Sequence, residues 1–235
     1  MIRHLLALVL TAAPLPALAQ AYQCVPPARI APSPRGIEQD GPSRRTPIGG
    51  FTLAASWSPE YCKSAGGRSG SSYQCSGEIG RFGFILHGLW PESNSGPPPQ
   101  WCSHTPRPSP EVLRRNLCMT PEPYLLEHEW AKHGSCMART PDAYFRASAA
   151  LWQSLRLPDA DRLSRNRALT AGDLRDAFLA ANPDWRREQV GIDANPRGWL
   201  KELRLCYSAR YMPAACPRRT YGLPDSAPLK VWRGL

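Results

Sequence analysis

Short apolar runs at three places in the chain predict β-strands. Residues 51–59 read FTLAASWSP and end at a proline, which cannot donate a hydrogen bond within a central strand. Residues 82–87 read FGFILH and are apolar enough to lie in a core, and residues 199–208 form the third run. Each run has the length of a strand, so we expect the chain to build a sheet from them.

Helical spacing of apolar residues appears in three other segments. Residues 122–134 are predicted as a helix, with prolines near its start and a glycine at its end. A second helix is expected to begin after the N-cap Thr140. A third follows Thr170, whose Thr-Ala-Gly-Asp sequence resembles a capping box, and ends before Pro183. The apolar face of the second helix is formed by Tyr144, Phe145, Leu151, Trp152 and Leu155.

The order of these elements predicts a single α+β domain, in which an antiparallel β-sheet core has helices packed around it. The chain has 235 residues, enough for one domain with a substantial core. Residues 22–48 are rich in proline, arginine and serine, and we expect an extended leader there, so that the folded domain covers residues 49–235. Residues 63–80 and the proline-rich stretch 91–110 are predicted as loops.

The first 21 residues have the pattern of a secretory signal peptide. Arg3 and His4 give a positive start, an apolar run follows, and small residues near Ala19 suit a signal peptidase. The run is too short and too interrupted by prolines to span a bilayer. We therefore expect a secreted or periplasmic protein that is free of the membrane once the signal is removed. A buried N-terminal helix is the alternative.

Eight cysteines follow the predicted signal peptide. Their number is even and the chain is expected to be exported, so four disulfides are predicted. A structural zinc site usually has a close Cys-x-x-Cys pair, which is missing here, and no such metal is expected. The cysteines are Cys24, Cys62, Cys75, Cys102, Cys118, Cys136, Cys206 and Cys216.

The chain is basic, with a formal net charge of +10, of which the predicted signal peptide carries only Arg3. This charge suits a polyanionic partner such as nucleic acid, but it is also common on solvated surfaces. Charge alone therefore does not identify the partner.

One side of the helix predicted over residues 122–134 is unusually polar. Successive helix residues are rotated by about 100° around the helix axis. If His128 defines 0°, Lys132 lies at roughly 40°, Glu129 at roughly 100° and His133 at roughly 140°. Trp130 points elsewhere. An acid, an ammonium and two imidazoles on one face predict either a catalytic site or a solvated surface, because pairs four residues apart are common on exposed helices.

A zinc protease is the alternative explanation of these histidines. The His-Glu-x-x-His sequence of such enzymes places two imidazoles four residues apart on a helix. Here His133 comes five residues after His128, and Lys132 lies between them, where it would repel a cation. We therefore expect no catalytic metal.

His87 ends the strand predicted over residues 82–87. Gly88 removes a side chain next to the imidazole, and Trp90 offers a flat face on which a base can stack. A single histidine at the end of a strand is more often structural than catalytic. His87 taken alone therefore does not predict a catalytic site.

Two segments together resemble the active-site segments of the ribonuclease T2 family. They are HGLWP at residues 87–91 and HEWAKHGSC at residues 128–136. The resemblance extends more loosely over residues 50–220 and does not include the leader. It implies a monomeric endoribonuclease that cleaves single-stranded RNA, and not DNA, without metal or other cofactor. Cleavage passes through a 2′,3′-cyclic phosphate and ends with 3′-phosphates.

The resemblance also implies a role for each site residue. His133 is the general base that takes the 2′-hydroxyl proton, and His87 is the acid that protonates the leaving 5′-oxygen. Histidine suits both roles because its pKa is about 6.5. His128 holds the phosphate, while Glu129 and Lys132 stabilise the transition state. The charges around His133 conflict in sign and leave its pKa open. The family suggests a pH optimum below neutrality.

Two positions depart from the family pattern and leave base preference undetermined. Glu92 stands where many members have an aspartate that helps to read the base, and Ser56 stands where many have glutamine. Trp90 and Glu92 remain the expected substrate-binding residues, although Trp90 would stack on any base.

The resemblance supports a disulfide between Cys102 and Cys136. Cys206 and Cys216 flank a short, turn-rich segment and are expected to pair with each other. Three pairings remain open for the other four cysteines, and we prefer Cys62–Cys75 with Cys24–Cys118.

Overall fold

The computed structural model describes residues 23–34, 36–63, 72–104 and 106–233. The predicted signal peptide, residues 1–21, lies outside the described residues. So does much of the loop predicted over residues 63–80.

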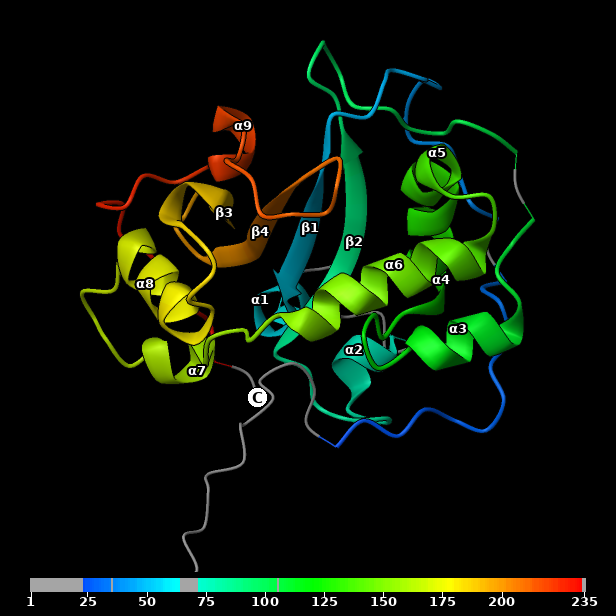
Figure 1. The fold of residues 1–235 in the computed structure, drawn as a ribbon. Coiled ribbons are helices and arrows are strands. Elements are labelled where there is room, and N and C mark those ends of the chain that lie inside the picture. The colour runs from blue at the N-terminus through cyan, green and yellow to red at the C-terminus, as the bar shows by residue number, and fades with distance from the viewer. Residues whose placement is uncertain (1–22, 35, 64–71, 105, 234–235) are drawn as a thin grey trace, which may run out of the picture.

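Four strands form one antiparallel sheet in the described part of the chain, and their order is β2-β1-β4-β3 (Figure 1). Helices surround this sheet, so the predicted single α+β domain is confirmed. The short strand β3 was not predicted. The strands are β1 (Gly50–Trp57), β2 (Phe84–Glu92), β3 (Val190–Ala194) and β4 (Leu200–Ser208).

Six of the helices in the described part of the chain lie in two groups. Helices α3 to α6 are placed on the β2 side of the sheet, and α7 and α8 on the β3 side (Figure 1). The helices are α1 (Ser58–Lys63), α2 (Tyr73–Ser76), α3 (Pro110–Asn116), α4 (Pro123–Glu129), α5 (Ser135–Met137), α6 (Pro141–Ser154), α7 (Ala160–Leu163), α8 (Ala171–Ala181) and α9 (Arg218–Tyr221). A π-helical turn (Trp130–Gly134) joins α4 to α5, and a 3₁₀ turn (Arg187–Gln189) precedes β3.

The predicted helix starts are confirmed by their caps. The side chain of Thr140 accepts a hydrogen bond from the Ala143 amide at the start of α6. Thr170 and Asp173 bond to each other's backbone amides in a full capping box at the start of α8. The strand predicted over residues 51–59 is two residues too long, because Ser58 and Pro59 begin α1.

The two faces of the sheet differ in polarity, and this difference places the site. Leu203 and Leu205 of β4 are fully buried in the core beside Ala55 and Leu53 of β1. Glu202 and Arg204 alternate with these leucines along β4 and pair with Ser56 and Ala54. Because side chains alternate along a strand, these charged groups share the opposite face.

A β-bulge in β2 brings His87 to that polar face. Ala54 pairs with Gly88 and Ala55 pairs with Leu86, so His87 is one extra residue on β2. Leu86 thereby stays buried in the core, and the next side chain, that of His87, reaches Ser56 and Glu202. The expectation that His87 ends its strand is wrong, since β2 continues for five residues beyond it.

Four disulfides fasten the loops and the leader to this framework. They join Cys24 to Cys118, Cys62 to Cys75, Cys102 to Cys136 and Cys206 to Cys216. These pairs agree with the predicted ones. The Cys102–Cys136 bridge holds the loop after β2 against the turn that carries His133.

The leader packs along the folded domain. Arg44 and Gln100 exchange two backbone hydrogen bonds, and the Val25 amide donates to the Ile79 carbonyl at 2.8 Å. Ile30 is buried in the core. In Figure 1 the leader (blue) passes along the outer side of the α3–α5 group before it enters β1.

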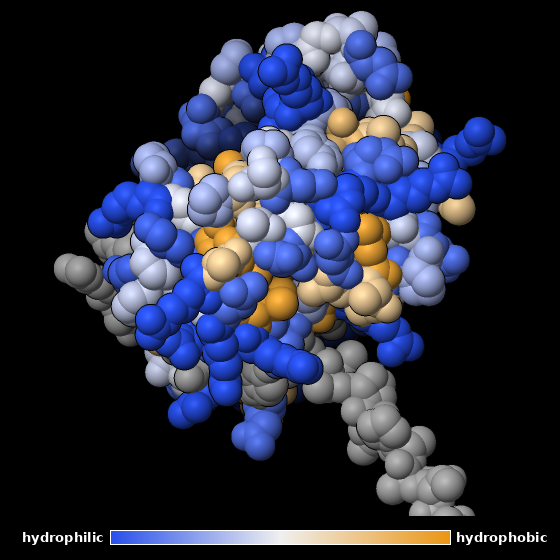
Figure 2. Space-filling model, turned by 90° about the vertical axis from the view of Figure 1, so that its left-hand side faces the viewer, coloured by the Kyte–Doolittle hydropathy of each residue, from blue (hydrophilic) through white to orange (hydrophobic). Residues whose placement is uncertain are grey.

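The surface of the β3 side is predominantly hydrophilic, with hydrophobic residues in separate patches (Figure 2). Among the described residues, none of the helices has both the length and the apolar character needed to cross a membrane.

Candidate active site

His87 is held on the sheet by contacts to both of its ring nitrogens. Its Nδ1 lies 2.7 Å from Oε1 of Glu202 and 3.2 Å from the hydroxyl of Ser56. Its Nε2 lies 3.6 Å from Oε1 of Glu129, which comes from α4 across the site. The imidazole is therefore placed between a carboxylate of the sheet and a carboxylate of the helix.

The helix that carries the second histidine is not a continuous α-helix. The backbone amide of Ser135 donates to the carbonyl of Trp130, five residues earlier, so the last turn is π-helical. The α-helix predicted over residues 122–134 is thus wrong in its last turn. A π turn holds more residues than an α turn, so two residues five apart differ less in direction around the helix axis. The turn therefore rotates His133 toward the helix face that carries His128.

Carbonyl groups displaced by the π turn bond to other donors. The Trp101 amide donates to the Lys132 carbonyl at 2.7 Å, and the Ser135 hydroxyl donates to the Ala131 carbonyl at 2.7 Å. The Cys102 amide donates in turn to the Ser135 hydroxyl. The loop after β2 and the Ser135 side chain thus provide hydrogen-bond donors to carbonyls of the turn, close to the Cys102–Cys136 bridge.

The ring of Trp90 lies close to both catalytic candidates. Its ring centroid is 5.2 Å from that of His87 and 5.7 Å from that of His133. Its Nε1 donates to Oε2 of Glu129 at 2.7 Å. Trp90, which sequence analysis assigned to base stacking, thus also joins β2 to the polar helix.

Gly88 allows the Glu129 carboxylate to approach β2. A Cβ atom at this position would overlap Oε2 of Glu129 and crowd Nε1 of Trp90. The glycine was expected to allow a close approach of backbone or ligand, and the group that approaches is this buried carboxylate.

The leader supplies an acid to the site that sequence analysis missed. Oδ2 of Asp40 lies 2.6 Å from Nζ of Lys132 and 3.7 Å from Nε2 of His128. Its Oδ1 accepts a hydrogen bond from Nε1 of Trp101. The ammonium of Lys132 is therefore fixed at the site by the leader.

Glu92 lies at the other end of β2 and is bonded through both carboxylate oxygens. Oε1 accepts from the Thr52 hydroxyl at 2.8 Å, and Oε2 pairs with Arg219 of α9 at 2.5 Å. Of the expected site residues, Trp90, His128, Glu129, Lys132 and His133 gather around His87, whereas Glu92 is engaged elsewhere on the strand.

The two histidines have opposite pKa shifts. Burial, together with the positive charges of Lys132 and His128, lowers the pKa of His133 to about 3. Burial also lowers the pKa of His87, but the hydrogen bond to Glu202 and the charges of Glu129 and Glu202 outweigh it and raise that pKa above its usual value. His133 is thus neutral where His87 is still protonated.

The two carboxylates that face His87 also differ. Burial raises the pKa of Glu129 to about 7, against the opposing effects of His87 and the Trp90 N–H. Burial raises the pKa of Glu202 as well, but the hydrogen bond and charge of His87, together with Arg204, bring it down to about 2. Glu202 is therefore the carboxylate that remains ionised through the acidic range.

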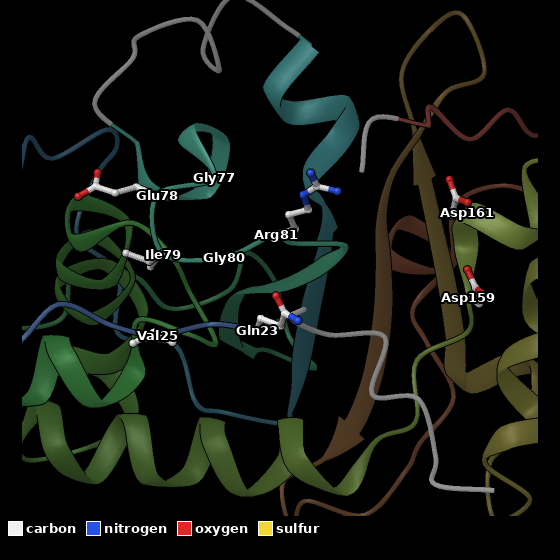
Figure 3. Close-up of a pocket in the computed structure, with 9 residues that line it drawn as sticks. All are labelled: Gln23, Val25, Gly77, Glu78, Ile79, Gly80, Arg81, Asp159 and Asp161. Carbon is white, nitrogen blue, oxygen red and sulfur yellow. The ribbon is translucent and has the colours of Figure 1, made fainter.

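Cavity size does not locate this cluster. A cavity of about 710 Å³ lies between the start of the leader, residues 77–81 and α7, away from both histidines (Figure 3). A smaller one of about 290 Å³ reaches His87 and Glu202 and is bordered by Tyr61 and Lys201. The cluster is defined by its polar groups.

Glu202 and Asp40 are the site residues that sequence analysis missed. The alternation of charged and leucine residues over 202–205 could have indicated that β4 has one polar face. Nothing in the sequence around Asp40 indicates that the leader returns to Lys132.

The fold and this cluster describe an α+β protein with a histidine-containing polar site between its sheet and one helix. The model of the Ribonuclease T2 family matches residues 48–167, about half of the chain. The chain belongs to the ribonuclease T2 family.

Two bacterial ribonucleases are similar to this chain in sequence, and one solved structure shares its fold. A probable ribonuclease of Haemophilus influenzae is 29% identical over 187 residues, which cover 75% of this chain and 64% of the relative. A ribonuclease of Aeromonas hydrophila is 33% identical over 114 residues, 48% of each chain. The match therefore spans about half to two thirds of these relatives' length. The structure of RNase NT in complex with 5′-AMP has the same fold, with a TM-score of 0.59 at 18% identity, covering 79% of this chain and 98% of that one.

Proposed function

We propose that this chain is a metal-independent endoribonuclease that cleaves single-stranded RNA with a pair of histidines. The observation that carries the proposal is the pair itself, because His87 and His133 both contact Trp90 and have opposite pKa shifts. An acid and a base at one site need such a difference. Membership of the ribonuclease T2 family supports the choice of substrate.

In the first step His133, which is neutral, takes the proton of the 2′-hydroxyl. The 2′-oxygen then bonds to the adjacent phosphorus, and the bond from phosphorus to the 5′-oxygen breaks. His87, which is protonated, gives its proton to that leaving oxygen. The products are a 2′,3′-cyclic phosphate and a free 5′-hydroxyl.

In the second step the two histidines exchange roles. His87, now neutral, takes a proton from water, and the hydroxide bonds to phosphorus. The bond to the 2′-oxygen breaks, and His133 returns its proton to that oxygen. A 3′-phosphate remains, and both histidines have recovered their initial protonation states.

The cations around the pair would stabilise the negative charge of the transition state. Lys132 has three N–H donors, of which Asp40 accepts one, so two remain for phosphate oxygens. His128 would hold the phosphate, and Glu129 would contribute through its contacts with His87 and Trp90. We propose Trp90 and Glu92 as the residues that contact the base; Glu92 would have to exchange its bond to Thr52 or Arg219 for one to the base.

We further propose that the protein acts as a monomer after export, in the periplasm or outside the cell. The four disulfides support an oxidising compartment. The signal-peptide pattern of residues 1–21 supports export, and residues 22–48 and 49–235 would form the leader and the catalytic domain.

A gel assay tests the function. Single-stranded RNA should be cut in the presence of excess chelator, and DNA of the same sequence should stay intact, because DNA lacks the 2′-oxygen nucleophile. Loss of RNA cleavage on chelation, with recovery when zinc is added, would instead support metal catalysis.

A further inference from the structure

We propose that Glu202 is a positioning residue for catalysis, which holds His87 with Nδ1–H directed to the sheet and keeps the ring protonated for its role as acid. This inference rests on the proposed function and assigns a role to a residue outside the two active-site segments. With Nδ1 occupied, Nε2 is the nitrogen left to exchange a proton with the substrate.

The contact is short and lies on a rigid part of the fold. Oε1 of Glu202 is 2.7 Å from Nδ1 of His87, and the Glu202 side chain is only 8% exposed. Glu202 sits on β4, in register with Ser56 of the neighbouring β1, and His87 comes from the bulge of β2 on the other side of β1. Three adjacent strands therefore fix the pair.

Every oxygen of the Glu202 carboxylate has a donor. Oε1 also accepts from the Ser56 hydroxyl at 3.1 Å. Oε2 accepts from Nε of Arg204 at 3.0 Å, and Arg204 is itself held by Asp193 at 3.1 Å. A carboxylate that is supported in this way stays ionised and cannot rotate away from the imidazole.

The groups that face His87 from other elements do not replace Glu202. Glu129 of α4 lies farther away, at 3.6 Å from Nε2, and its other oxygen accepts from Trp90. His133 of the π turn and His128 of α4 bring no negative charge, and Arg204 of β4 opposes protonation of His87. Glu202 is thus the acid that both touches the ring and is fully supported.

The test is the pH profile of Glu202→Gln. Glutamine keeps the shape and can still accept the Nδ1–H bond, so the variant removes mainly the charge. We expect kcat on an RNA dinucleotide to fall at least about tenfold, within the range that an acid–base term covers, with KM little changed. The alkaline limb of kcat/KM should move to lower pH, because loss of the negative charge favours neutral His87. The acid limb should stay in place.

Asp193→Asn is the matched control. It removes a carboxylate charge from the same polar face of the sheet. Asp193 bonds to Arg204, which in turn bonds to Glu202, and it has no contact with His87. Its alkaline limb should coincide with that of the wild type. An alkaline limb and kcat that are unchanged in Glu202→Gln would overturn the proposal, and so would an equal shift in Asp193→Asn.

Titration of the histidine ¹⁵N signals gives a readout that does not depend on activity. The His87 signals should titrate at lower pH in Glu202→Gln than in the wild type, and the wild-type ring should carry its last proton on Nδ1. If the wild type cleaves no RNA, the proposed function fails. The titration then decides the Glu202–His87 coupling separately, and an unmoved His87 titration overturns it.

Discussion

Replacing His87 or His133 by alanine is expected to lower kcat/KM for RNA by at least about a hundredfold in each case, the usual size of a general acid or base contribution. Each histidine moves a proton in both steps, so neither step can bypass it. Both rings lie close to Trp90, with centroid distances of 5.2 and 5.7 Å. His128→Ala should be less severe, because its proposed contact is with the phosphate.

The chain offers a matched control for these variants. His104 is exposed in the loop after β2, so His104→Ala makes the same chemical change away from the paired rings and should retain wild-type turnover. Thermal melting of each variant checks that the fold is retained. Near-normal turnover in folded His87→Ala or His133→Ala would disprove the two-histidine assignment.

The second large effect is on pH dependence, where the rate should form a bell with its centre below neutrality. The active form has His133 neutral and His87 protonated. His133, with a pKa of about 3, is neutral above that pH, and His87 stays protonated until pH exceeds its raised pKa. Above that value kcat/KM should fall about tenfold per pH unit, because the acid is lost.

The alkaline limb belongs to a coupled group. Glu129, whose pKa is raised by burial to about 7, lies 3.6 Å from Nε2 of His87, so the two share one macroscopic titration. Measuring kcat/KM on an RNA dinucleotide from acidic to alkaline pH gives both limbs. A rate that climbs steadily into the alkaline range, without a falling limb, would mean that no protonated histidine is needed.

The sequence was sufficient to predict the helix starts, because a helix cap depends only on neighbouring residues. Thr140 and Thr170 mark helix starts because a cap needs only its own side chain and the next three residues. The segment from His128 to His133 could be identified as a polar helix face for the same reason, while its catalytic role came from the family resemblance and stays a prediction. The optimum below neutrality, which the family suggested, is expected because burial lowers the pKa of His133; the carboxylates beside His87 act in the other direction, since they raise its pKa and extend the alkaline limb.

The parts of the site that sequence analysis missed depend on distant pairings. Glu202 meets His87 only because β4 pairs with β1 in one register and β2 carries a bulge, and neither can be deduced from a single strand. The π turn depends on donors from the loop around Trp101. Asp40 reaches Lys132 because the leader packs on the domain.

One change of a single atom in the substrate tests the central proposal most directly. We compare an RNA oligonucleotide with a copy in which the nucleotide immediately 5′ of a mapped cleavage site is a 2′-deoxynucleotide. Both are incubated with the enzyme and excess chelator, and the products are identified by mass spectrometry. The RNA should yield a 2′,3′-cyclic phosphate first and a 3′-phosphate later, and the copy should remain uncut at the modified position. Cleavage at the deoxy position, or products that end in a 5′-phosphate, would contradict catalysis by the two histidines through the 2′-oxygen.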